Sequence, residues 1–187
     1  MRNDLAWAAV TWPGLEHVIG RSDGGGFHAD SRLIMIEDGP ARVSYQLECD
    51  PGWGFRELTI AVTDASGDRS LVLTAADGRW RADGADRPDL AACVDIDINC
   101  TPLTNTLPIR RLAWSPGAAA DLDVAYVSVP ELDVRAVSQR YMQLAAGLYR
   151  YESGSFRVDL PVDEGGFVLD YPGFWTRVGE NPGPAPG

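Results

Sequence analysis

The sequence predicts a mainly β protein built from antiparallel strands. Between residues 32 and 81, short runs rich in β-branched and aromatic residues alternate with turn signals at residues 38–40, 50–52, 66–68 and 77–78. This spacing is typical of antiparallel strands joined by hairpins. The predicted strands are Leu33–Ile36, Val43–Cys49, Leu58–Val62, Leu71–Thr74 and Arg79–Arg81.

The segment before this meander begins with a predicted strand, Leu5–Trp12, which Pro13 and Gly14 end with a turn. Glu16, His17 and Arg21 form a polar cluster that fits a solvated strand face or the mouth of a site equally well. The glycine loop at residues 22–26 lacks the Lys and the Ser or Thr of a phosphate-binding loop, so we interpret it as a flexible connection.

The segment after residue 114 contains further strands. Leu122–Val129 alternates apolar residues on both faces, as in a buried strand, and Ser153-Gly154 indicates a hairpin. A last strand is expected at Phe167–Asp170. Asp133–Arg150 stays ambiguous, because its apolar residues fit a helical spacing and a strand face alike.

Residues 95–114 carry the densest group of polar side chains among turn-forming residues. From Cys93 to Asn99 apolar and acidic residues alternate, which predicts a strand with Asp95 and Asp97 on one face. We expect Thr101 to cap a short helical turn that Pro108 ends, because proline disfavours helical dihedrals in the preceding residue. An extended segment from residue 109 would then place Arg110 and Arg111 on opposite faces.

Two aspartates followed by two arginines must form ion pairs, bind a ligand, or do both. We assign Arg111 to a structural pair with Asp95 or Asp97, and Arg110 to a ligand. Polar residues at such turns are also common as structural punctuation, so a second interpretation is a structural or interaction protein in which this stretch forms a buried polar network and a partner carries the function. A third interpretation is a hydrolase or transferase that uses Asp95 and Asp97 as an acid/base pair, although residues two apart on a strand are too close to flank a glycosidic bond.

Composition excludes several classes. The 187 residues are 45% hydrophobic and carry a net charge of −11, which argues against nucleic acid and anionic membranes as partners. The expected organisation is one domain over residues 1–178 and a disordered Pro/Gly-rich tail over residues 179–187. Three cysteines, no signal segment and no membrane span predict a cytoplasmic protein with free thiols. With two histidines, neither near a cysteine, we expect no metal site, and we expect no cofactor.

Several longer motifs resemble a bacterial family of glycolipid-binding proteins. They are residues 101–112, TPLTNTLPIRRL, residues 139–141, QRY, residues 149–151, YRY, and residues 170–175, DYPGFW. The resemblance implies a rolled antiparallel sheet or an incomplete β-barrel around an apolar cavity, with one or two short helical turns and only a minor α contribution. It also implies that Asp133–Arg150 is mainly strand, and it supplies no catalytic residues.

The leading functional hypothesis is therefore non-enzymatic binding of a lipid or glycolipid-like amphiphile, with its apolar part in the cavity and its head group at a polar rim. Arginine suits a phosphate or carboxylate head group. The expected ligand-binding residues are Trp80, Asp97, Asn105, Arg110, Gln139, Tyr141, Tyr151 and Tyr171.

Overall fold

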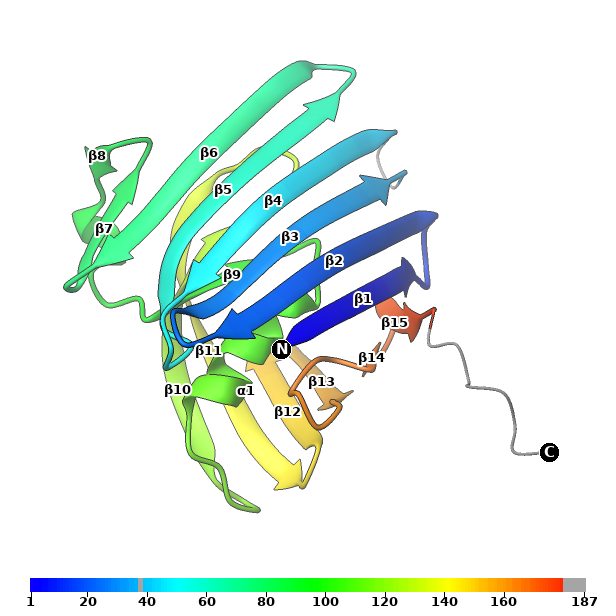
Figure 1. The fold of residues 1–187 in the computed structure, drawn as a ribbon, viewed down its shortest axis with the longest axis vertical. Helices are drawn as coiled ribbons and strands as arrows, with labels where there is room; N and C mark the ends of the chain where they lie inside the picture. Colours follow the sequence, from blue (N-terminus) through cyan, green and yellow to red (C-terminus); the bar gives the residue numbers. More distant parts are fainter. Residues whose placement is uncertain (37–38, 180–187) are drawn as a thin grey trace.

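A ten-stranded antiparallel sheet forms the larger part of the computed structural model, which describes residues 1–36 and 39–179 (Figure 1). Its strand order is β14-β15-β1-β2-β3-β4-β5-β6-β7-β8, so a continuous meander is extended at β1 by two strands from the far end of the sequence. The strands are β1 (Arg2–Ala9), β2 (Gly14–Asp23), β3 (Gly26–Met35), β4 (Ala41–Cys49), β5 (Phe55–Asp64), β6 (Gly67–Ala76), β7 (Arg79–Ala82), β8 (Ala85–Asp86), β14 (Asp170–Tyr171) and β15 (Trp175–Val178).

A second sheet of five strands has the order β13-β12-β11-β10-β9. Its strands are β9 (Asp95–Ile98), β10 (Ala119–Val127), β11 (Val134–Ala145), β12 (Leu148–Ser153) and β13 (Phe156–Pro161). All of its pairings are antiparallel except that of β9 with β10. The expectation that residues 133–150 are mainly strand is confirmed, because β11 and β12 occupy this region.

The two sheets meet along their edges without closing into a barrel. At one edge, the segment between β13 and β14 folds back on itself, with a bridge between Val162 and Val168 and a backbone hydrogen bond of 2.8 Å from Leu169 N to Pro161 O. Beyond β8, at the far end of the large sheet, Arg87 donates from Nη2 to the carbonyl oxygen of Val134 at the start of β11 over 2.7 Å. The predicted class, a rolled and mainly antiparallel sheet, is confirmed.

Short helical segments fill the space between the sheets: η1 (Pro88–Leu90), η2 (Leu103–Asn105) and α1 (Thr106–Arg111). Leu103 and Leu107 are fully buried in the main core with the inward residues of the large sheet. Ile109 instead joins a second cluster with tyrosines of the small sheet. The helical segments lie on the concave side of the large sheet (Figure 1), and Leu90, Leu103 and Leu107 belong to the same core cluster as its inward residues.

The prediction that Pro108 ends the helical turn is wrong. Pro108 lies inside α1, and the amide of Leu112 donates to its carbonyl oxygen over 3.1 Å. Proline is tolerated there because the backbone nitrogens of a first helical turn need no intrahelical acceptor. Arg110 and Arg111 are consequently helical rather than extended, and they diverge by about 100° around the helix axis.

Two further expectations are corrected at the turns and at the end of the chain. The glycine loop predicted at residues 22–26 is shorter than expected, because β2 and β3 pair up to Asp23 and Gly26 and leave a two-residue turn. The strand expected at Phe167–Asp170 is a single bridge at Val168 followed by the two-residue strand β14. Of the predicted tail at residues 179–187, only Gly179 lies within the described residues.

Candidate functional site

The two aspartates of β9 have different partners. Asp95 is fully buried and forms a two-point ion pair with Arg111, with Nη2 2.6 Å from Oδ2 and Nε 3.2 Å from Oδ1. Asp97 is half-buried and accepts hydrogen bonds from Thr104 Oγ1 at 2.9 Å and from Gln139 Nε2 at 2.6 Å. Loss of hydration raises the pKa of both carboxyls above the ordinary value, and these hydrogen bonds partly oppose the rise. Asp97 therefore has neutral partners where Asp95 has a cation.

Asp97 lines a pocket of about 240 Å³ that lies between the ends of β9, β12 and β13 and the β14–β15 hairpin. Asn105, Tyr151 and Tyr171, all predicted site residues, line the same pocket. Its other lining residues are Ile98, Asn99, Thr101, Tyr126, Ser153, Phe156, Phe174 and Trp175. No basic side chain is among these lining residues, so the pocket offers oxygen atoms, amide groups and aromatic rings.

Two more predicted residues support the pocket from behind. Gln139 holds Asp97, and the hydroxyl of the buried Tyr141 donates to Asn105 Oδ1 over 2.9 Å. The Asn105 amide nitrogen in turn donates to the carbonyl oxygen of Pro102 over 3.2 Å. These bonds fix which atoms of Asn105 and Asp97 remain available to a ligand.

One wall of the pocket is a cluster of aromatic rings. Tyr151 lies 6.1 Å from Phe156 and 6.4 Å from Tyr171, measured between ring centroids, and Tyr171 lies 5.3 Å from Phe174. Phe174 also contacts Trp12 edge-to-face at 6.1 Å. Rings packed in this way present rigid apolar surface, and the tyrosines add polar tips.

Trp80 and Arg110 lie away from this pocket. Trp80 is buried, stacks on Phe55 at 5.0 Å and donates from Nε1 to the carbonyl oxygen of Cys93 over 3.2 Å. The guanidinium of Arg110 lies 5.1 Å from the ring centroid of Trp53 and borders a separate surface hollow next to Gly166. Six of the eight predicted residues thus come together, and these two do not.

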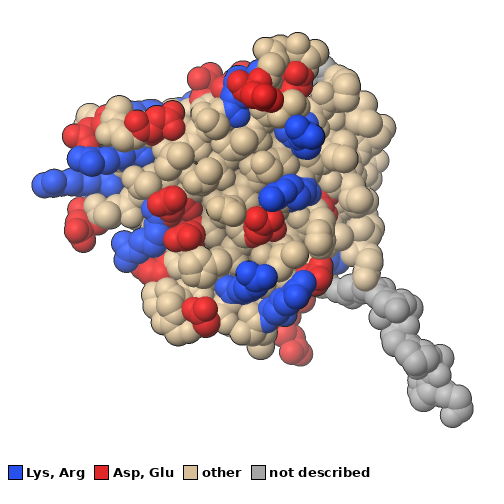
Figure 2. All heavy atoms as spheres, turned by 45° about the horizontal axis from the view of Figure 1, so that its top comes forward, with Lys and Arg blue, Asp and Glu red and all other residues tan. Residues whose placement is uncertain are grey.

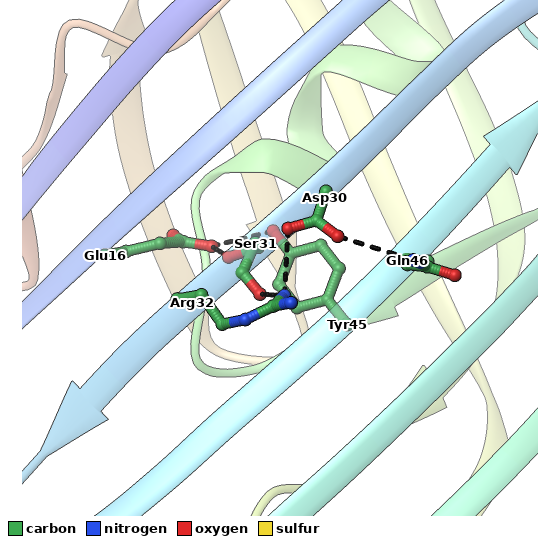
Figure 3. A network of polar contacts seen from close by, with 6 residues as sticks. All are labelled: Glu16, Asp30, Ser31, Arg32, Tyr45 and Gln46. Atoms are coloured by element: carbon green, nitrogen blue, oxygen red, sulfur yellow. Dashed lines mark hydrogen bonds and ion pairs between the residues drawn. The ribbon is translucent and has the colours of Figure 1, made fainter.

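Sequence reasoning missed a buried network behind the pocket, centred on Glu16 of β2. Glu16 is fully buried, and its Oε1 accepts from Ser31 Oγ and from the Tyr45 hydroxyl, each at 2.7 Å (Figure 3). Its Oε2 accepts from Thr101 Oγ1 at 2.7 Å, and Thr101 lines the pocket. Burial raises the pKa of Glu16 to about 6, against the lowering effect of these three hydroxyls.

The polar residues on the opposite face of the same strands form a separate set. Asp30 accepts from Arg32 at 2.9 Å and from Gln46 at 3.4 Å on the exposed face of β3 and β4 (Figure 3). The alternation of a strand thus sends Ser31 inward to Glu16 while its neighbours stay at the surface. Neither interpretation offered for Glu16, a solvated face or a site mouth, describes its place in the core.

The site has no arrangement typical of a metal centre. In the described part of the chain, no three His, Cys, Asp or Glu side chains gather in a way that could hold an ion. The three hydroxyls on Glu16 are neutral donors, as are the partners of Asp97. Such an arrangement can present hydrogen-bond acceptors to a ligand rich in hydroxyl groups.

Comparison with known proteins assigns the chain to a family whose description names ligand binding. A family model described as "Putative glycolipid-binding" matches residues 4–177, and the chain belongs to this family. A crystal structure of a DUF1089 family protein from Pseudomonas aeruginosa is 38% identical, covers 88% of this chain and 92% of its own, and has a TM-score of 0.81. No curated protein matched the sequence.

Proposed function

We propose that the pocket around Asp97 binds the neutral, hydroxyl-rich head group of a glycolipid-like amphiphile without changing it chemically. The observation that carries this proposal is the combination of a wall of aromatic rings with a carboxylate that has only neutral partners. Aromatic faces suit the apolar face of a sugar ring, and fixed oxygen atoms suit its hydroxyl hydrogens. The family description supports glycolipid binding in general terms.

The charge of the lining favours a neutral head group over an anionic one. Asp97 would repel a phosphate or carboxylate in a confined site, and the lining contains no arginine to compensate. Arg110, which we expected to meet an anionic head group, borders a different hollow. The proposed binding residues are therefore Asp97, Asn105, Tyr151 and Tyr171, with Gln139 and Tyr141 as positioning residues.

The size of the pocket limits what it can hold. At about 240 Å³ it is smaller than the roughly 300–1,000 Å³ typical of sites that enclose a whole drug-sized ligand. The head group alone would occupy it. The acyl chain would then lie outside the pocket, since helical side chains fill the concave face of the large sheet.

Titration with soluble amphiphiles tests the proposal. Octyl glucoside below its micellar concentration should bind at least tenfold more tightly than octanol or octyl phosphate, measured by calorimetry and intrinsic tryptophan fluorescence. Tyr171→Ala and Asp97→Asn should each weaken glucoside binding by about tenfold or more, because each removes a direct contact.

Asp121→Asn is the matched control, because Asp121 is an exposed carboxylate paired with Arg140 on the surface. Binding should be unchanged in this variant. Tighter binding of octyl phosphate, or equal glucoside affinity in all three variants, would contradict a neutral-sugar site here. Release of glucose from octyl glucoside on prolonged incubation would favour the hydrolase alternative instead.

A further inference from the structure

Exposed large hydrophobic side chains gather at one place on this molecule. Among the described residues eight such side chains are exposed, and Met1, Val72 and Val94 are the three that lie apart. We call the other five the apolar edge: Val10, Leu15, Ile34, Ile36 and Phe174. Their exposed fractions run from 37% for Phe174 to 58% for Ile34, so each presents a large part of its surface to solvent.

The backbone pairing shows that these residues are neighbours. Leu15 on β2 faces Ile34 on β3 in the antiparallel register, which places both side chains on the same face of the sheet. The amide of Ile36 donates to the carbonyl oxygen of Pro13 over 3.1 Å. The amide of Val10 donates to the carbonyl oxygen of Phe174 over 2.9 Å, which joins the β1–β2 turn to the β14–β15 turn (Figure 1).

Charge is also depleted along this edge. Residues 9–15, 33–36 and 171–175 contain no charged residue, although 23% of the chain is charged. Charged residues border the edge, since Glu37 and Asp38 follow Ile36 in the sequence and the exposed Arg42 on β4 lies opposite Ile34 on the same face of the sheet. Figure 2 shows charged side chains across the left and centre of one view, while its right-hand margin is almost free of them. A group of exposed apolar side chains in a surface region poor in charge marks a contact with another apolar surface.

The apolar edge is continuous with the candidate pocket. Phe174 belongs to both, because it is exposed and also lines the pocket beside Tyr171 and Trp175. Trp12, from the β1–β2 turn, packs edge-to-face on Phe174 at 6.1 Å and on Trp175 at 5.7 Å. Tryptophan and tyrosine are the residues that favour the boundary between a bilayer's apolar interior and water.

We propose that the apolar edge contacts the surface of an electrically neutral lipid bilayer and holds the pocket opening against the head groups. A net charge of −11 opposes an anionic membrane, and the edge offers no basic cluster that would attract one. No helix of the described residues is long and apolar enough to cross a membrane. Bilayer contact is independent of the pocket, whereas presentation of a head group rests on the proposed function.

Vesicle flotation tests the surface. The protein should float with phosphatidylcholine vesicles that contain no glycolipid, and it should bind no better when phosphatidylglycerol is added. Leu15→Ser combined with Ile34→Ser should lower the partition coefficient at least about tenfold, because two exposed apolar side chains no longer enter the bilayer. Both side chains are exposed, and a thermal melt checks that the variant remains folded.

Val72→Ser is the matched control, because Val72 is an exposed apolar residue of the same sheet outside the apolar edge. It should leave flotation unchanged. Equal loss in the control and the double variant, or flotation that requires phosphatidylglycerol, would overturn the proposal. So would a dimer in light scattering that Ile34→Ser converts to a monomer, which would make the edge an interface between two copies.

The two proposals can fail separately. The double variant should bind octyl glucoside in solution as the original protein does, because Leu15 and Ile34 do not line the pocket. Tyr171→Ala should still float with phosphatidylcholine vesicles while losing glucoside binding. If the original protein floats but binds no glucoside, the apolar edge is supported and the sugar site is contradicted. If it binds glucoside but does not float, the sugar site is supported and bilayer contact is contradicted.

Discussion

Glu16 is a carboxylate buried among neutral hydroxyls, and its protonation should change the free energy of unfolding. The folded protein binds this proton more tightly than the unfolded chain, since burial raises the pKa from 4.5 to about 6. The unfolded chain therefore binds fewer protons between these values, and the free energy of unfolding should fall as pH rises through this window. A shift of this size corresponds to about 2 kcal/mol.

Replacing Glu16 with Gln tests this effect, because glutamine keeps a carbonyl acceptor and has no ionisable group. As the pH rises from about 4 to about 7, the free energy of unfolding of the original protein should fall by about 2 kcal/mol relative to that of the variant. Urea melts across this range measure it. Parallel curves for the two proteins would show that Glu16 has no shifted pKa.

The surroundings of Glu16 also show why the site is only partly predictable from the sequence. The spacing of Glu16 and Val18 places both on one strand face, yet a carboxylate is seldom fully buried, so the sequence suggests a solvated face or a site mouth and not the core. Its three partners come from β3, β4 and the turn after β9, and no local pattern links these segments. Tyr126 and Phe156 also line the pocket, although they lie far from Asp97 in the sequence, on β10 and β13.

The ion pair of Arg111 and Asp95 connects α1 to β9. Asp95 has an exposed fraction of 0% and Arg111 of 23%, so removing the cation would leave a buried charge without a partner. Arg111→Ala should lower the free energy of unfolding by about 3 kcal/mol. Arg140→Ala removes an exposed pair with Asp121 and should cost less than about 1 kcal/mol. Equal midpoints in urea for both variants would contradict this difference.

Local turn chemistry explains which elements could be predicted. The meander from β3 to β7 follows turn signals that lie beside each strand in the sequence, so its strands were found. The prediction that Pro108 ends the helical turn is wrong because proline only disfavours helical dihedrals in the residue before it. Burial of Leu107 outweighs this preference. β15 was missed because its partner, β1, lies at the opposite end of the sequence.

The reactivity of the three cysteines should report on unfolding of the entire protein. Cys49, Cys93 and Cys100 are free and buried, and burial raises the pKa of Cys49 to about 12 and that of Cys93 to about 11. Thiols held in the neutral form react slowly, since the thiolate is the nucleophile. A thiol reagent at mildly alkaline pH should therefore label native protein slowly and label all three cysteines after unfolding. Rapid labelling of one cysteine in the folded protein would reveal local opening.

The pairing of β1 with β15 constrains when the large sheet can be completed. β1 emerges from the ribosome before every other described strand, and β2 to β7 can add to it one hairpin at a time. The other edge of β1 has no partner until residues 175–178 have been synthesised. The nascent chain thus carries an unpaired β-edge through most of its synthesis, and such edges invite association with other chains. The need for chaperones should accordingly fall once β15 has left the ribosome and paired with β1.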